Sequence, residues 1–237
     1  MTQKKQGRRT AQDSEKTKHK IMMVATDLFC ERGYEKVSLR NISDEAGVSH
    51  SLIRYHFGSK DKVWYAISDD LHEHMENYIN TIAKKFPKTA KANEKLYFFV
   101  VHILAHMLIY KRPIQFMADA VRQEKELFYY FINRSGELHN IIFSLADNYN
   151  ASHIEKPVNI QEVKWQMLMF AHGAASLSPF IEETWGSETV HYDECLLSHW
   201  KMFNRMMVSL FQIPADFVIK PNSIKELIYD VPSKYSW

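Results

Sequence analysis

The sequence predicts an all-α protein with a small N-terminal three-helix domain, which carries a helix-turn-helix, and a larger C-terminal helical domain. Three observations predict it. Apolar residues recur at helical spacing along most of the chain, a capped turn joins two short helices near residue 47, and no segment requires a strand. The 237 residues suffice for one or two buried cores. We expect a basic arm at 1–13, the helix-turn-helix domain at 14–62 and the second domain at 63–237.

The helix-turn-helix is predicted from the order of residues between Val37 and Lys60. Ser38 and Ser49 are suited to cap two successive helices, because a hydroxyl can accept a hydrogen bond from a free backbone N–H one turn on. Gly47 tolerates the turn conformation between them. The apolar positions that would face the core are Leu39, Ile42, Ala46, Val48, Ile53 and Phe57. In such motifs the second helix enters the DNA major groove.

The predicted reading helix covers about 49–56 and would present Ser49, His50, Ser51 and Arg54 to DNA. Arg54 can donate two hydrogen bonds to a guanine edge, which is the commonest specific contact. The shorter side chains of His50 and Ser51 discriminate less. Arg40, on the preceding helix, can reach a base or a phosphate.

The same stretch, VSLRNISDEAGVSHSLIRYHFGSKDKVW, resembles the DNA-binding signature of the TetR (tetracycline repressor) family of bacterial transcription regulators. The Ser-x-Arg-x-Ile opening, the Ala-Gly-Val-Ser turn and the closing Tyr55-His56-Phe57-x-x-Lys60 carry the likeness, which covers about residues 16–67. By this resemblance, Ser38, Tyr55, His56 and Lys60 would hold the DNA backbone. Beyond residue 67 the resemblance is architectural only.

Charge and composition indicate a cytoplasmic protein. The net charge is only +2, but basic residues cluster in the first 20 positions, where an arm would lie on phosphates, enter the minor groove, or remain a solvated tail. No apolar run is long enough to span a bilayer, so we expect no membrane partner. Cys30 and Cys195 stand far apart, which favours a reducing compartment.

Helical periodicity continues through the chain. The first helix is expected at 16–32 and the helix after the motif at 60–86, followed by helices at 93–111, 113–122, 124–148, 160–182 and 190–211, with Pro179 kinking the sixth of these seven. The tail at 214–237 is too apolar for a free linker. It either wraps the second domain or joins a subunit interface.

The last two long helices are apolar on more than one side, and a second partner surface is therefore required. The resemblance implies that each subunit of a homodimer contributes an antiparallel helix pair to a four-helix interface. Two reading helices one DNA turn apart would then read a palindromic operator in double-stranded DNA.

The middle helices are rich in methionine, aromatic residues and histidine, which can line an apolar pocket or simply pack a core. The resemblance favours a pocket for an unknown small apolar or aromatic effector, whose binding releases a repressor from DNA. An activator or a ligand-independent regulator is the alternative. The candidate lining residues are His106, Met107, Tyr110, Phe116, Met117, Phe128, Trp165, Met169 and His172.

An alternative of another class is a metal-dependent enzyme or metal sensor. His102 and His106 stand at i and i+4, which places both imidazoles on one helix face. No third ligand follows nearby in sequence, and no nucleophile elbow, phosphate-binding glycine loop or paired-cysteine spacing is present. We therefore expect no cofactor, no metal and no enzymatic activity.

Overall fold

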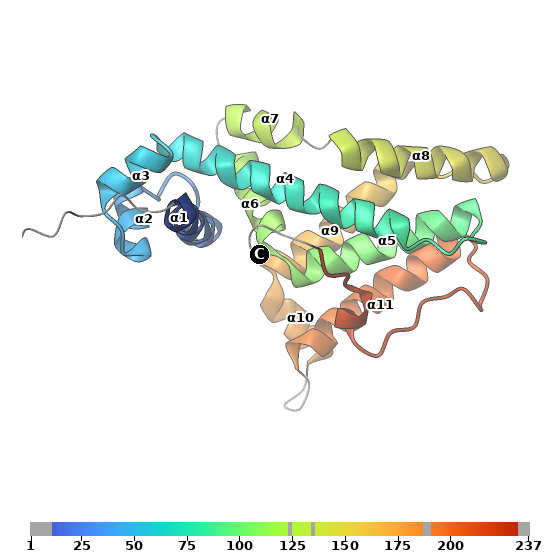
Figure 1. The fold of residues 1–237 in the computed structure, drawn as a ribbon. Coiled ribbons are helices and arrows are strands. Elements are labelled where there is room, and N and C mark those ends of the chain that lie inside the picture. The colour runs from blue at the N-terminus through green and yellow to red at the C-terminus, as the bar shows by residue number, and fades with distance from the viewer. Residues whose placement is uncertain (1–10, 123–124, 134–135, 187–190, 232–237) are drawn as a thin grey trace, which may run out of the picture.

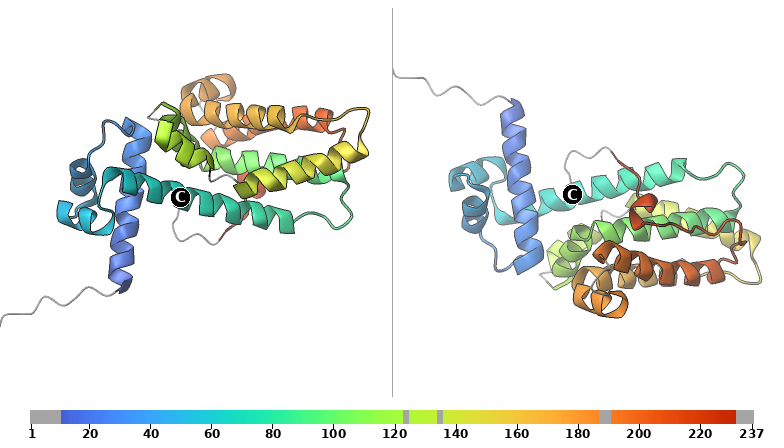
Figure 2. Two further views of the ribbon diagram at one scale, coloured as in Figure 1. Left: turned by 90° about the horizontal axis from the view of Figure 1, so that it is seen from above. Right: turned by 90° about the horizontal axis from the view of Figure 1, so that it is seen from below.

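The computed structural model describes residues 11–122, 125–133, 136–186 and 191–231, and every regular element within these ranges is a helix. The predicted all-α class is confirmed. Three helices form a separate group at one end of the molecule (Figures 1 and 2). They are α1 (Ala11–Arg32), α2 (Leu39–Ala46) and α3 (His50–His56).

A long helix, α4 (Lys60–Lys84), leads from this group into a helical bundle, whose centre is α5 (Figure 1). The sequence of α5 is apolar on all sides, and it packs against α4, α8, α9 and α11. A helix that is packed on all sides is expected to be apolar on all sides, because none of its faces meets water. The elements of the bundle are α5 (Ala92–Ile109), α6 (Arg112–Arg122), α7 (Lys125–Asn133), α8 (Gly136–Ser152), α9 (Ile160–Ser176), α10 (Ser178–Trp185), α11 (Tyr192–Leu210) and the short 3-10 helix η1 (Ile224–Leu227).

Two hydrophobic cores divide the buried residues, and α4 belongs to both. Its first half, through Leu71, packs with α1–α3, whereas Tyr78, Ile79 and Ile82 belong to the bundle core. Helix α6 is shared in the same way. Phe116 and Ala120 lie in the first core and Ile114 in the second. The Phe116 ring stacks on Trp64, with centroids 4.7 Å apart and planes 20° apart.

Three helix predictions were wrong in their bounds. The first helix begins at Ala11, so the last part of the predicted 1–13 arm is helical, and residues 1–10 lie outside the described residues. The predicted 124–148 helix is two helices, α7 and α8, and the second begins at Gly136, a residue that disfavours a helix interior. Similarly, α10 follows α9 as a separate helix, because Pro179 is tolerated in a first turn but not in an interior.

The described part of the tail wraps the second domain, which is the first of the two alternatives predicted for it. Ile224 and Leu227 are buried against α5 and α11. Tyr97 accepts a hydrogen bond from the backbone N–H of Ile219 at 3.0 Å, and the Tyr229 ring stacks on His102. Residues 232–237 lie outside the described part of the chain. Among the described helices, none combines the length and hydropathy needed to cross a bilayer.

Replacing Phe116 by alanine is expected to lower the free energy of unfolding by about 3–5 kcal/mol, because the ring is fully buried between the two cores. Urea unfolding followed by circular dichroism at fixed protein concentration measures the change. Tyr129→Ala on α7, where the ring is 55% exposed, is the control and is expected to shift stability by less than about 0.5 kcal/mol. A loss below that limit in Phe116→Ala would show that the stack does not join the cores.

Candidate nucleic-acid interface and effector pocket

Local hydrogen bonds fix the helix-turn-helix. The Ser38 hydroxyl accepts from the Asn41 backbone N–H at 3.2 Å, and the Asn41 side chain accepts from the Ser38 N–H at 2.9 Å, which forms a capping box. Gly47 ends α2 in the left-handed conformation, with φ of 60°. Ser49 then caps α3 by accepting from the Leu52 N–H at 3.2 Å. The three predicted roles are confirmed.

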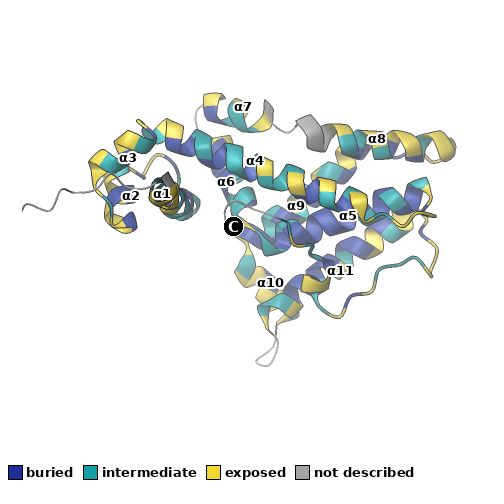
Figure 3. Ribbon diagram, in the orientation of Figure 1, coloured by how far each residue is buried: buried dark blue, intermediate teal, exposed yellow. Residues whose placement is uncertain are grey.

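Helix α3 buries one side and exposes the other (Figure 3). Ile53 is fully buried, and Phe57 follows it into the first core. His50, Ser51 and Arg54 are exposed, and Tyr55, at 80%, is among the most exposed large side chains described. The Tyr55 ring contacts the adjacent His56 ring, with centroids 5.2 Å apart, and most of its remaining surface is open to a partner.

The start of α4 is tied to the loop that follows α1. The Lys60 ammonium donates to the Tyr34 carbonyl oxygen at 3.1 Å and lies 3.9 Å from the centroid of the Tyr34 ring. The Tyr34 hydroxyl donates to Asp61, and burial together with this hydrogen bond raises the tyrosine pKa. An ammonium has three N–H donors, so Lys60 retains donors for a phosphate.

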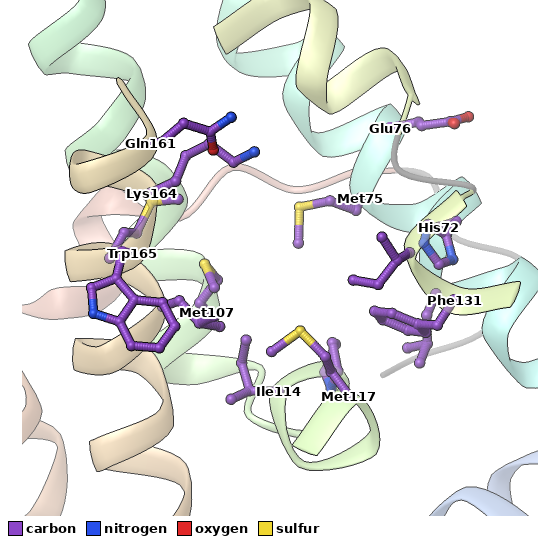
Figure 4. Close-up of a pocket in the computed structure, with 15 residues that line it drawn as sticks. His72, Met75, Glu76, Met107, Ile114, Met117, Phe131, Gln161, Lys164 and Trp165 are labelled. Atoms are coloured by element: carbon purple, nitrogen blue, oxygen red, sulfur yellow. The ribbon is translucent and has the colours of Figure 1, made fainter. Parts of the chain in front are cut away.

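An apolar pocket of about 370 Å³ lies between α4, α6, α7 and α9 (Figure 4). Its volume is within the range of small-molecule sites. Apolar side chains dominate the lining, four of them methionines, and four polar residues complete it. The lining residues are Leu71, His72, Met75, Glu76, Met107, Pro113, Ile114, Met117, Phe131, Ile132, Gln161, Lys164, Trp165, Met167 and Leu168.

Comparison with known proteins places the first domain. Residues 21–67 match the model of "Bacterial regulatory proteins, tetR family". The N-terminal domain belongs to the tetR family. Over 63 residues the chain is 38% identical to the HTH-type transcriptional repressor Rv3405c of Mycobacterium tuberculosis, covering 27% of this chain and 34% of that protein. It is 28% identical over 76 residues to the HTH-type transcriptional activator FasR of Mycolicibacterium smegmatis, covering 32% and 33%.

The chain thus spans about a third of the length of the curated relatives it matches. Across the tetR-family domain and the bundle together, the fold is similar to the transcriptional regulator FadR of Bacillus subtilis in complex with stearoyl-CoA. That alignment has a TM-score of 0.55 and 16% identity, and it covers 77% of this chain and 95% of FadR. At this identity the likeness concerns the fold alone.

All of the predicted DNA-contacting residues lie in the tetR-family domain or at the start of α4. They differ in how far their side chains are already engaged within the protein. Ser38 and Ser49 use their hydroxyls as caps, and Ser49 also lies 2.9 Å from the Ser51 hydroxyl. The exposed Arg40 lies 3.9 Å from Asp44 in a surface ion pair, which costs little to break. His56 is half-buried between neighbouring rings.

The predicted pocket residues are scattered. Met107, Met117 and Trp165 line the cavity. Phe116 instead stacks on Trp64 in the first core, and His106 is buried against Tyr78. The others are outside the lining: Tyr110, Phe128, Met169 and His172. Conversely, sequence reasoning did not single out Lys164, Met75 or Phe131, because helical periodicity marks a buried face without saying which cavity it meets.

The two histidines of the metal hypothesis have different partners. The His102 ring lies between Phe98 and Tyr229, and its Nδ1 is 2.7 Å from the Phe98 carbonyl oxygen. His106 Nε2 instead lies 3.1 Å from His74 Nε2. Burial lowers the pKa of His102 to about 4 and that of His106 to about 3. Within the described residues, no group of three histidine, cysteine or acidic side chains is placed to hold a metal.

One contact that the sequence did not reveal joins the tetR-family domain to the bundle. Asp119 on α6 accepts a hydrogen bond from the backbone N–H of Tyr34 at 2.9 Å, although 85 residues separate them. Nearby, Arg112 pairs with Asp27 at 2.6 Å. Because Tyr34 also contacts Lys60, the loop after α1 is held from both α6 and α4.

Arg54→Ala is expected to weaken binding to a preferred DNA site by about 1–3 kcal/mol and to relax the preference at one base pair. The exposed guanidinium makes no cap, so the fold should be retained. Fluorescence anisotropy with single-base variants of the site measures both effects. Lys84→Ala removes one exposed positive charge at the far end of α4 and should leave affinity unchanged. Equal losses in the two variants would contradict base reading by Arg54.

Proposed function

We propose that this protein is a homodimeric, sequence-specific DNA-binding transcription regulator that represses from a palindromic operator and is released by a small apolar effector. The observation that carries the proposal is α3. The Ser49 cap and the buried Ile53 hold the helix, and its outward side presents Arg54, His50 and Ser51 to solvent. This is the arrangement that a major-groove reading helix requires. Ser38, Arg40, Ser49, Tyr55, His56 and Lys60 complete the proposed DNA contacts.

Selection of bound duplexes from a random library tests the proposal. We expect a palindromic sequence with half-sites centred about 10 base pairs apart or at a multiple of one turn. Affinity for it should fall steeply as salt rises, because phosphate contacts release counterions. Absence of any preference over random competitor DNA at moderate salt would refute sequence-specific regulation.

The observations support DNA binding more strongly than they support repression over activation. Similarity to Rv3405c supports a repressor, whereas the match to FasR, an activator by name, keeps activation as a second candidate. Each match covers less than a third of this chain, so neither decides the direction of regulation. Transcription from a promoter that carries the selected site distinguishes them, since purified protein should reduce the transcript if it represses and increase it if it activates.

We place the dimer interface on α9, α10 and α11, which pack against one another and expose large apolar side chains. Phe180 is 63% exposed, and Leu177, Met206 and Leu210 are exposed as well. Gly173 supports this placement. A Cβ added there would meet no atom within 4 Å, so the glycine serves no packing in its own protomer. In a helix interior it costs about 0.5–1 kcal/mol relative to alanine, a cost that close approach of a partner helix explains.

Gly173→Leu is therefore expected to leave the protomer folded but to shift it from dimer to monomer, because the new side chain occupies space that the partner needs. Size-exclusion chromatography with light scattering measures the mass, and circular dichroism the fold. Ser144→Leu, at an exposed position on α8, is the control and should remain dimeric. A Gly173→Leu protein that remains dimeric would show that the interface lies elsewhere.

The pocket supports effector control because two of the helices that line it, α4 and α6, also pack in the core of the DNA-binding domain. Helix α4 contributes Leu71, His72, Met75 and Glu76, and α6 contributes Pro113, Ile114 and Met117. A ligand that binds better to one relative position of these helices shifts the equilibrium toward it, and thereby changes the spacing of two reading helices. The structure of Bacillus subtilis FadR in complex with stearoyl-CoA supports ligand binding by this fold.

A further inference from the structure

The polar groups at the edge of the pocket indicate which head group a ligand would have. Lys164 and Gln161 lie three residues apart on α9 and so share one face of the helix. Figure 4 shows their amino and amide ends together above the apolar lining. Glu76 stands on α4, and in the same view its carboxylate points away from the cavity.

Lys164 is in an unusual setting for a lysine. It is half-buried, and none of the ion pairs formed between described residues includes it. Its ammonium lies 5.5 Å from the centroid of the Phe143 ring, which is a weak partner for a charge. Burial lowers its pKa, so the charged form lacks the solvation that an anion would restore.

The body of the pocket suits a flexible apolar group. Four methionines, Met75, Met107, Met117 and Met167, line it. Unbranched thioether side chains adapt to irregular shapes and make favourable contacts with alkyl chains and ring edges. Phe131 and Trp165 complete the apolar walls, and Trp165 is 61% exposed at the mouth.

We propose that the pocket takes an amphipathic monocarboxylate, whose apolar chain or ring lies among the methionines and whose carboxylate binds the Lys164 ammonium with help from the Gln161 amide. The inference rests on the proposed function only in treating the pocket as the effector site. A neutral hydroxyl can accept a hydrogen bond from the Lys164 ammonium but brings no charge to pair with it, and a cationic head group is repelled.

Isothermal titration of the full-length protein with decanoate, decan-1-ol and decylammonium, each below its aggregation concentration, tests the head group. We expect decanoate to bind at least about tenfold more tightly than either of the others, a difference of about 1.4 kcal/mol, because only the carboxylate brings a negative charge to the ammonium. Equal affinities, or preference for decylammonium, would overturn the inference. No binding by any of the three would overturn both the inference and the effector role of the pocket.

Lys164→Met keeps a long apolar side chain and removes the charge. It should abolish the preference for decanoate over decanol while leaving decanol binding intact, whereas Lys84→Met, the same change at an exposed position outside the pocket lining, should leave the preference unchanged. A preference for decanoate that persists in Lys164→Met would assign the carboxylate to another group. Both variants should bind the selected DNA site as the wild type does without ligand. Failure of the wild type to select any DNA site would refute regulation without touching the ligand result.

Discussion

The Trp64 and Phe116 rings, stacked 4.7 Å apart, join a helix of the DNA-binding domain to a helix of the bundle. Beside them, Asp119 accepts from the buried Tyr34 N–H. Removing that acceptor would leave a buried donor unsatisfied, which costs about 1–3 kcal/mol. The Arg112–Asp27 pair is partly exposed and adds less. Among the described helices α3 packs mainly against α1 and α2, so its position relative to the bundle depends on this contact and on α4.

The location of the pocket follows from the same contact. Helix α6 turns Phe116, Asp119 and Ala120 toward the DNA-binding domain and Ile114 and Met117 toward the cavity or the bundle. Successive residues in a helix are separated by about 100°, so one short helix can serve both neighbours. A ligand that displaced Met117 would therefore act on α6, and the opposite side of α6 contacts the DNA-binding domain.

The helix-turn-helix could be predicted because its determinants are local. Ser38, Gly47 and Ser49 act on backbone groups within a few residues, and the spacing of Ile42, Ile53 and Phe57 reports burial directly. The pocket could not be predicted to the same degree. Periodicity marks Phe116 and Met117 alike as apolar, but only the packing of α6 between two cores sends one ring to Trp64 and the other side chain to the cavity. The i, i+4 spacing of His102 and His106 was misleading for a related reason, since the tail at Tyr229 and His74 on α4 separate their environments.

The two cores are connected where α4 and α6 pass between them, and both crossings border the cavity. On α4 the crossing lies between Leu71, in the first core, and Tyr78, in the second, and the intervening Met75 lines the pocket. The far end of α4 is held by the tail, through Tyr78 against the Leu227 carbonyl and Lys85 beside the Tyr229 ring. Both ends of α4 are therefore anchored, the first in the core of α1–α3 and the second in the bundle and the tail, and the segment that borders the pocket lies between them. Under the proposed effector control, a ligand in the pocket would therefore act on α4 and α6, the two helices that belong to both cores.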